Sequence, residues 1–343
     1  MWFDDLKKYC DACGVSGFEK ETAELIAADI KPFCDELYYD KVGNLVAVKK
    51  GTAPTRKPIV YLAHLDEVGM MIRHIGDDGT LLFDQVGIMA DVLQSKRVLV
   101  GPQHIRGLIG AKPVHLQKEK GKKAPEIDEM YIDIGVSSRE EAEKLGVYAA
   151  YAAFENDFHV FGTDGAFVRS KALDDRIGCT VMAQMIRSGV KHDSVFVFTL
   201  GEELGGVGAL AATREFEPEV AIILESTTAS DLPCNKGADA VCSLGNGAVV
   251  PFMDGGTRYD HTLYKRIRAL AAEHDIKTQT KTRVAGGTDA ASVQRAIGGV
   301  RVAAVSLPCR YIHSSSCVAA KADMENMLKL VACIDENADK LIG

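Results

Sequence analysis

The sequence has no apolar run close to the roughly 20 residues that a membrane-spanning helix requires, and its start, MWFDDLKKYC, lacks the apolar stretch of a signal peptide. With 10 prolines in 343 residues and no low-complexity tract, it has the composition of an ordinary globular protein. Net positive charge is missing too, because 40 basic and 48 acidic residues give a formal charge of −8. Nucleic acids and anionic membranes repel an acidic surface, so we expect neither as a partner.

A disulfide framework is also absent. The nine cysteines are odd in number and scattered along a large chain, which favours a reducing, cytoplasmic environment. Cys10 and Cys13 have C-x-x-C spacing, but no second pair and no His-x-His segment lies nearby. We therefore predict two cysteines on the first helix and not a structural zinc or redox site.

Several catalytic signatures are missing as well. The sequence contains no G-x-S-x-G, no G-x-x-x-x-G-K-[ST] and no H-E-x-x-H. The glycine-rich stretch Gly201–Gly208 contains two adjacent carboxylates, which would repel a pyrophosphate. These absences exclude a nucleophile-elbow serine hydrolase, a P-loop nucleotide site and a dinucleotide site.

Apolar strand patterns alternate with helical patterns over much of the chain. Continuous apolar runs, typical of strands buried on both faces, occur at Pro58–Ala63, Val195–Leu200, Val220–Leu224 and Val300–Leu307. Helical periodicity occurs at Asp174–Gly189, Gly206–Glu215, Tyr259–His274, Ala290–Ala296 and Lys321–Ile342. This alternation predicts an α/β fold with a largely parallel central sheet flanked by helices.

Residues 71–162 have a different character. Short alternating runs punctuated by glycines predict a small β-rich domain, with one helix at Ser138–Leu145 and a basic, solvated loop at Gln117–Glu129. A chain of 343 residues also exceeds what one compact core usually holds. We therefore predict a discontinuous α/β domain, residues 1–70 and 163–343, into which the β-rich domain of residues 71–162 is inserted.

Metal-capable side chains follow the predicted strands of the α/β domain. His64 ends the first apolar run, Glu202 and Glu203 follow the second, Glu225 follows the third, and His313 comes a short loop after the fourth. Open α/β sheets bind ligands at the carboxyl ends of their strands, so we expect these side chains to converge. The doublet Asp174-Asp175 joins them at the start of a helix.

Each of these groups alone has an ordinary explanation, as a core histidine, a helix cap or a solvated acidic turn. Glu202 and Glu203 are harder to explain this way, because they follow six apolar residues and burial without partners costs several kcal/mol. Two histidines with several carboxylates suit zinc, cobalt or manganese better than magnesium or calcium. Two such ions about 3.5–4 Å apart polarise a carbonyl and activate a bridging water. A nearby carboxylate that is not a ligand shuttles the proton, so we predict hydrolysis of an amide.

The motifs at these positions resemble those of the M42 metallo-aminopeptidases, the relatives of glutamyl and tetrahedral aminopeptidases. The matching segments are Ala63–Gly69, Lys171–Gly178, Gly201–Gly205, Ala229–Pro233 and Arg310–Ser314, with further likeness at Val15–Glu19, Asp40–Leu45 and Asp133–Ser138. They cover essentially the whole chain in the family's order.

The resemblance implies a role for each site residue. The metal ligands would be His64, Asp174, Glu203, Glu225 and His313. Asp66 would orient the His64 ring, and Glu202 would be the general base. The residues alone leave open whether Asp174 or Asp175 bridges the ions, and the family pattern implies Asp174. Glu225 stands where many members have aspartate.

The resemblance also implies partners and an assembly. Two divalent ions per subunit, zinc or cobalt with manganese as the alternative, would serve hydrolysis of short peptides from their N-termini. The inserted domain resembles the family's PDZ-like dimerisation domain, and dimers would assemble into a tetrahedral dodecamer. We keep two alternatives: a metal-dependent hydrolase of another linkage, such as an N-acyl amide or the glycosidic bond of relatives named endoglucanases, and a shell-forming or peptide-binding protein with a decayed site.

The loop Val284–Ala290 is glycine-rich, so its backbone can approach a ligand closely. Gly286, Gly287 and Thr288 are our candidates for substrate binding. A plain turn that caps the next helix at Thr288 or Asp289 explains the same sequence. The sequence leaves the preferred first residue of the substrate open.

Overall fold

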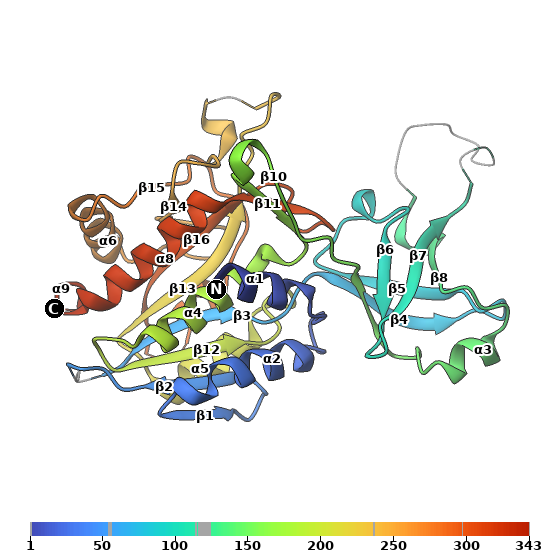
Figure 1. Cartoon of the computed structure of the whole chain (residues 1–343), viewed down its shortest axis with the longest axis horizontal. Helices are drawn as coiled ribbons and strands as arrows, with labels where there is room; N and C mark the ends of the chain where they lie inside the picture. The colour runs from blue at the N-terminus through green and yellow to red at the C-terminus, as the bar shows by residue number, and fades with distance from the viewer. Residues whose placement is uncertain are drawn as a thin grey trace.

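The computed structural model describes residues 2–53, 57–113, 115, 125–235, 237–296 and 298–342. An α/β body packs beside a smaller β barrel, as Figure 1 shows. Most of the predicted basic loop at residues 117–129 lies outside the described residues.

The body is built on one sheet with the strand order β1-β2-β12-β3-β13-β16-β14-β15. Its strands are β1 (Glu36–Tyr39), β2 (Leu45–Lys49), β3 (Ile59–His64), β12 (Ser194–Thr199), β13 (Val220–Thr228), β14 (Ala248–Val249), β15 (Thr278–Gln279) and β16 (Arg301–Cys309). The central strands β12, β3, β13 and β16 are parallel, whereas β2 and β14 flank them antiparallel. The predicted parallel arrangement is therefore found in the four central strands of the sheet. The β1–β2 hairpin forces one edge to be antiparallel, since a short turn reverses the chain.

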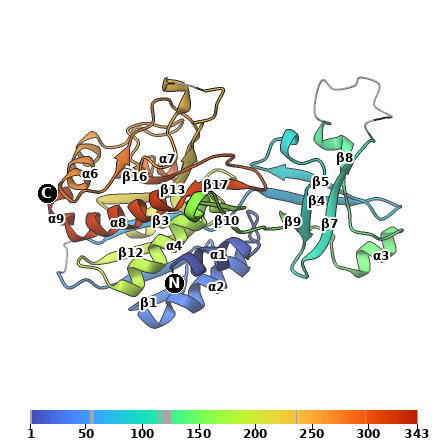
Figure 2. The same cartoon turned by 45° about the horizontal axis from the view of Figure 1, so that its top comes forward.

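Helices cover both faces of this sheet (Figure 2). They are α1 (Trp2–Asp11), α2 (Lys20–Ile30), α4 (Leu173–Ser188), α5 (Val207–Phe216), α6 (His261–Glu273), α7 (Ala290–Gln294), α8 (Lys321–Glu336) and α9 (Ala338–Ile342). Tyr61 of β3 points to the face that α4 and α8 cover, while its neighbours Val60 and Leu62 point to the face of α5 and α7. The alternation of side chains along a strand produces this division.

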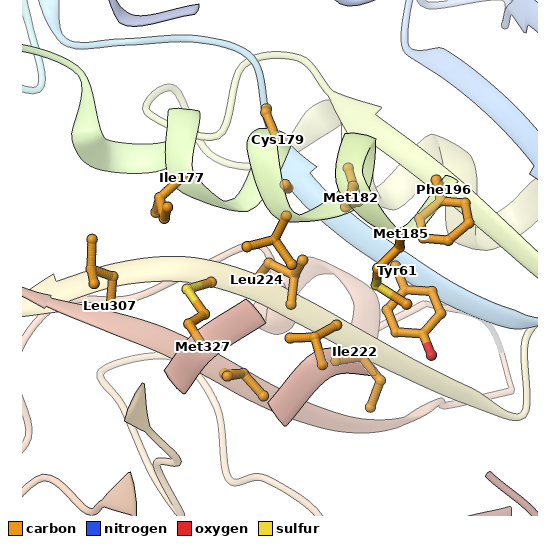
Figure 3. Packing of buried hydrophobic residues seen from close by; sticks show 14 of the residues in the cluster. Tyr61, Ile177, Cys179, Met182, Met185, Phe196, Ile222, Leu224, Leu307 and Met327 are labelled. Atoms are coloured by element: carbon orange, nitrogen blue, oxygen red, sulfur yellow. The ribbon is translucent and has the colours of Figure 1, made fainter. Parts of the chain in front are cut away.

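The core between α4 and the sheet is tightly packed. Met182 and Met185 of α4 belong to the same hydrophobic cluster as Tyr61, Phe196 and Leu224 of the sheet, as Figure 3 shows. The rings of Tyr61 and Phe196 stack with their centroids 5.1 Å apart. This packing fixes α4, and with it the acidic doublet at its start, against the carboxyl ends of the central strands.

Two predicted helices differ in detail from the observed ones. The helix expected over Lys321–Ile342 breaks at Asn337, whose φ of −117° and ψ of 22° end α8. The helix expected from Asp174 has non-helical dihedral angles at Asp174 and Asp175, and their peptide bond is cis. Regular helical geometry begins at Arg176, so the two carboxylates lie on an irregular turn and not in a helical first turn.

The inserted segment forms a closed barrel in the order β4-β5-β8-β7-β6-β9. Its elements are β4 (Gly69–Ile75), β5 (Leu81–Val86), β6 (Arg97–Val100), β7 (Ile105–Ala111), β8 (Met130–Asp133), α3 (Arg139–Lys144) and β9 (Tyr151–Phe154). The barrel has a hydrophobic core of its own, which includes Met70, Phe83 and Ile132. Ser138 caps the predicted short helix by accepting a hydrogen bond from Glu141 N at 3.3 Å.

The chain returns from the barrel through a small separate sheet. β10 (His159–Phe161), β11 (Phe167–Ser170) and β17 (Cys317–Ala320) pair in that order. β11 leads directly into α4, and β17 leads into α8. Among the described residues, no helix is both long and apolar enough to span a membrane.

Candidate functional site

The carboxyl ends of the central strands bring the predicted metal ligands together. His64 ends β3, and the β3–β13 register, which pairs Leu62 with Ile223, places Glu225 beside it. Nε2 of His64 lies 3.4 Å from Glu225 Oε1 and 3.4 Å from Asp174 Oδ1. One histidine and two carboxylates thus face a common point.

A second group lies on the other side of Asp174. Nε2 of His313 is 3.4 Å from Asp174 Oδ2 and 3.4 Å from Glu203 Oε1. In each group the nitrogen and oxygen atoms lie within 4.8 Å of one another. Asp174 belongs to both groups and directs a different oxygen to each. We call these five residues, His64, Asp174, Glu203, Glu225 and His313, the central cluster.

Asp175 is placed differently from Asp174. Its Oδ1 accepts a hydrogen bond from Gly178 N at 3.0 Å, and its side chain is fully buried on the helix side of the turn. The carboxylate of Asp174 lies against the ring nitrogens of both histidines. The irregular turn at the start of α4 separates the two side chains.

The central cluster has the chemistry of a cation site. Oδ1 of Asp174 is buried and accepts no hydrogen bond in the described part of the chain. Burial raises the pKa of Glu225 well above its usual value, and burial together with the charge of Asp174 raises the pKa of Glu203 to about 7. Carboxyl groups this crowded hold protons unless positive charge is supplied, and divalent ions would supply it. The residues therefore fit a metal centre with nitrogen and oxygen ligands.

Burial alone would lower the pKa values of the two histidines, but the neighbouring carboxylates raise them by more. The pKa of His64 is held well above its usual value by Glu225 and Asp174 although desolvation alone would lower it. A hydrogen bond to Asp174 raises the pKa of His313 to about 9. In a metal centre the same ring nitrogens would be deprotonated and would bind the ions.

Asp66 connects the central cluster to the turn that follows β12. Nδ1 of His64 lies 3.0 Å from the backbone oxygen of Asp66 and 3.3 Å from its Oδ1. The same carboxylate accepts hydrogen bonds from the backbone N–H groups of Glu202 and Glu203, both at 3.1 Å. Asp66 thus orients the ring and also fixes the Glu202-Glu203 turn.

Ser16 is a supporting residue that the sequence did not reveal. Its hydroxyl donates to Asp66 Oδ2 at 2.6 Å, across 50 positions of sequence. No local pattern marks such a contact. The family-like segment Val15–Glu19 contains Ser16 but does not identify Asp66 as its partner.

A buried ion cluster lies directly behind the site. Both carboxylate oxygens of Glu67 accept from Lys171 Nζ at 2.6 Å, and Oε1 also lies 3.2 Å from Arg176. Gly14 N donates to the same Oε1 at 2.9 Å. These contacts join the segment before α2, the end of β3 and the start of α4, and so hold the elements that carry His64 and Asp174.

Glu202 lies beside the central cluster and faces an open cavity of about 690 Å³. Burial, together with the nearby Asp289 and Glu203, raises the pKa of Glu202 to about 8. Gly286, Gly287 and Thr288, the predicted substrate-binding residues, line the same cavity. All the predicted site residues therefore belong to the central cluster, contact it or line this cavity.

Comparison with known proteins gives one consistent result. Residues 43–330 match the family model described as M42 glutamyl aminopeptidase. A putative aminopeptidase of Acetivibrio thermocellus is 36% identical over 334 residues, which cover 96% of this chain and 97% of the relative. A lysyl aminopeptidase of Pyrococcus furiosus is 33% identical, with 96% of each chain covered. The solved structure of the Pyrococcus horikoshii TET1 peptidase, described as assembling into a tetrahedron or a large octahedral shell, matches with a TM-score of 0.86 at 30% identity, over 98% of this chain and 99% of that one.

Proposed function

The chain belongs to the M42 glutamyl aminopeptidase family, and on this premise we propose that it removes N-terminal residues from peptides at a co-catalytic two-metal centre. The observation that carries the proposal is the position of Asp174 between two histidine–carboxylate groups, with one oxygen toward each. A carboxylate in this position suits the bridge of a two-metal site.

The central cluster divides between the two ions. His64 and Glu225 would hold one ion, Glu203 and His313 the other, and Asp174 both. Zinc or cobalt suits this set of imidazole and carboxylate ligands, and manganese is the alternative. When bound, the two ions supply Lewis acidity, which polarises the scissile carbonyl and makes water acidic enough to attack near neutral pH.

Glu202 is the proposed general base. Its carboxylate takes a proton from the attacking water and delivers it to the nitrogen of the leaving amine. Asp66 keeps the Glu202 backbone in place through the 3.1 Å hydrogen bond described above. A base with a raised pKa holds the proton long enough to pass it on, which a solvated glutamate does poorly.

A panel of matched anilides tests the activity. The protein loaded with zinc, cobalt or manganese should release the aniline from aminoacyl anilides, and should act at least about 100-fold more slowly on the N-acetylated forms, which lack the free amine. An N-acyl hydrolase would instead release acetate from the N-acetylated forms and leave the anilide bond intact. A decayed peptide-binding protein would cleave none of them, although every proposed ligand and the base are present in this chain.

We also propose that the chain forms two domains with different roles. Residues 1–70 and 163–343 form the catalytic domain, and residues 71–162 form a PDZ-like dimerisation domain. The separate core of the barrel supports this division. The free state of the nine cysteines supports a cytoplasmic location.

For the assembly, we propose dimers that combine into a tetrahedral dodecamer, in line with the shell of the TET1 relative. Light scattering should then give a mass of about 440 kDa, twelve chains of 37.0 kDa each. A mass that stays at one or two chains at micromolar concentration would contradict this assembly and would leave the catalytic proposal intact.

A further inference from the structure

Lys281 places a buried ammonium group in the wall of the catalytic cavity. The residue follows β15 and is 7% exposed, yet it lines the same cavity as Glu202 and His313. Its Nζ donates one hydrogen bond, to Ala285 O at 2.9 Å. Within the described residues it makes no ion pair. An ammonium has three donors, so two are left for a ligand or for water in the cavity.

A buried, unpaired cation is costly, and nearby carboxylates do not compensate for it. Burial lowers the pKa of Lys281, and Asp254 is the first of the neighbouring charges that oppose this shift. Asp254, however, already accepts hydrogen bonds from Gly256 N at 2.8 Å, Thr257 N at 2.7 Å and the Tyr259 hydroxyl at 2.6 Å. Among the described residues no carboxylate forms an ion pair with Lys281, although Glu225 and Asp174 also act on its charge, and a buried charge normally has such a partner.

Part of the cavity wall is polar. Thr227, Thr228 and Thr288 line it, together with a second cation, the exposed Arg295. At Gly286 and Gly287 the space that a Cβ would occupy has no neighbour within 4 Å, so the backbone leaves room for a ligand. Hydroxyl and ammonium donors around an open space suit a carboxylate better than an aliphatic or a basic side chain.

We infer that Lys281 is a specificity-determining residue that binds the side-chain carboxylate of glutamate or aspartate at the N-terminus of the substrate. The inference rests on the proposed aminopeptidase function and adds the substrate class. Family membership alone does not decide this point, because the family description names glutamyl substrates and a 33% identical relative is named a lysyl aminopeptidase. A lysine side chain would meet like charge at Lys281.

Replacement of Lys281 by methionine keeps most of the side-chain volume and removes the charge. For the metal-loaded native protein we expect kcat/KM for the glutamyl anilide to exceed that for the glutaminyl anilide by at least about tenfold. In Lys281→Met this ratio should fall to within about threefold, through loss of the glutamyl rate only. Lys281→Glu should favour the lysyl anilide. Lys329→Met, a change of an exposed lysine on α8, should leave every ratio unchanged.

The substrate series separates the possible failures. If the native protein cleaves no aminoacyl anilide, the proposed function itself fails. Cleavage of leucyl or lysyl anilides in preference to the glutamyl one overturns only the role of Lys281, and so does an equal loss on every substrate in Lys281→Met. Leu-Leu and its C-terminal amide form a further comparison. If Lys281→Met slows only the free acid, Lys281 binds the carboxyl end of the peptide, and the inference is overturned.

Discussion

Incubation with a chelator should abolish aminoacyl anilide hydrolysis, by about a thousandfold or more, and zinc, cobalt or manganese should restore it. In the metal-free site the buried carboxylates of Asp174, Glu203 and Glu225 face one another with only two histidines to balance them. Without the ions, the site loses the Lewis acids that would polarise the carbonyl for attack by water. Elemental analysis of the restored protein should give two ions per chain.

Control measurements separate loss of metal from loss of structure. Circular dichroism and light scattering of the chelated protein should show whether the fold and the assembly persist while activity is absent. Undiminished hydrolysis of the aminoacyl anilides in excess chelator would contradict the two-metal mechanism.

Substitution of Glu202 by glutamine should lower kcat by about 10²–10⁴-fold, the range for loss of a general base. The change preserves shape and removes only the ability to accept a proton. Metal content should stay at two ions per chain, because Glu202 is proposed as the base and not as a ligand. Stopped assays with the glutamyl and leucyl anilides, together with elemental analysis, measure both effects.

Glu219→Gln is the matched control, since Glu219 is exposed before β13 and lies away from the cavity wall. It should leave kcat unchanged. If Glu202→Gln kept full activity, the assignment of the base would be wrong, while membership of the family would stand. Loss of one ion in Glu202→Gln would instead identify Glu202 as a metal ligand. The metal content is worth measuring because Glu202 lies close to His64 and Glu203.

Much of this site could be predicted because it depends on strand ends. Apolar runs identify β3, β12 and β13, and the parallel arrangement of these strands places His64, Glu203 and Glu225 at one edge of the sheet. Such signals are local, so a single sequence contains them. The direction in which Asp174 points depends on an irregular turn at Asp174 and Asp175, which the helical periodicity of the sequence conceals.

What could not be predicted depends on contacts between distant segments. Ser16 reaches Asp66 across 50 residues, and Lys281 lines the cavity only because β15 joins the edge of the sheet. Closure of the barrel is a similar case. The alternating runs predict strands, but β9 must pair with both β4 and β6 to close the ring, and no pattern in the sequence specifies those partners.

The connection between β3 and the barrel is short and packed against the α/β body. Only Leu65–Val68 separate His64 from Gly69, the first residue of β4. A Cβ at Gly69 would lie 2.3 Å from Val15 Cγ2 and 3.0 Å from the oxygen of Ala152, and Glu67 N donates to Gly14 O at 2.9 Å. These contacts hold the start of β4 against the segment that precedes α2. If subunits assemble through their barrels, these contacts would set the orientation of each catalytic cavity within the assembly.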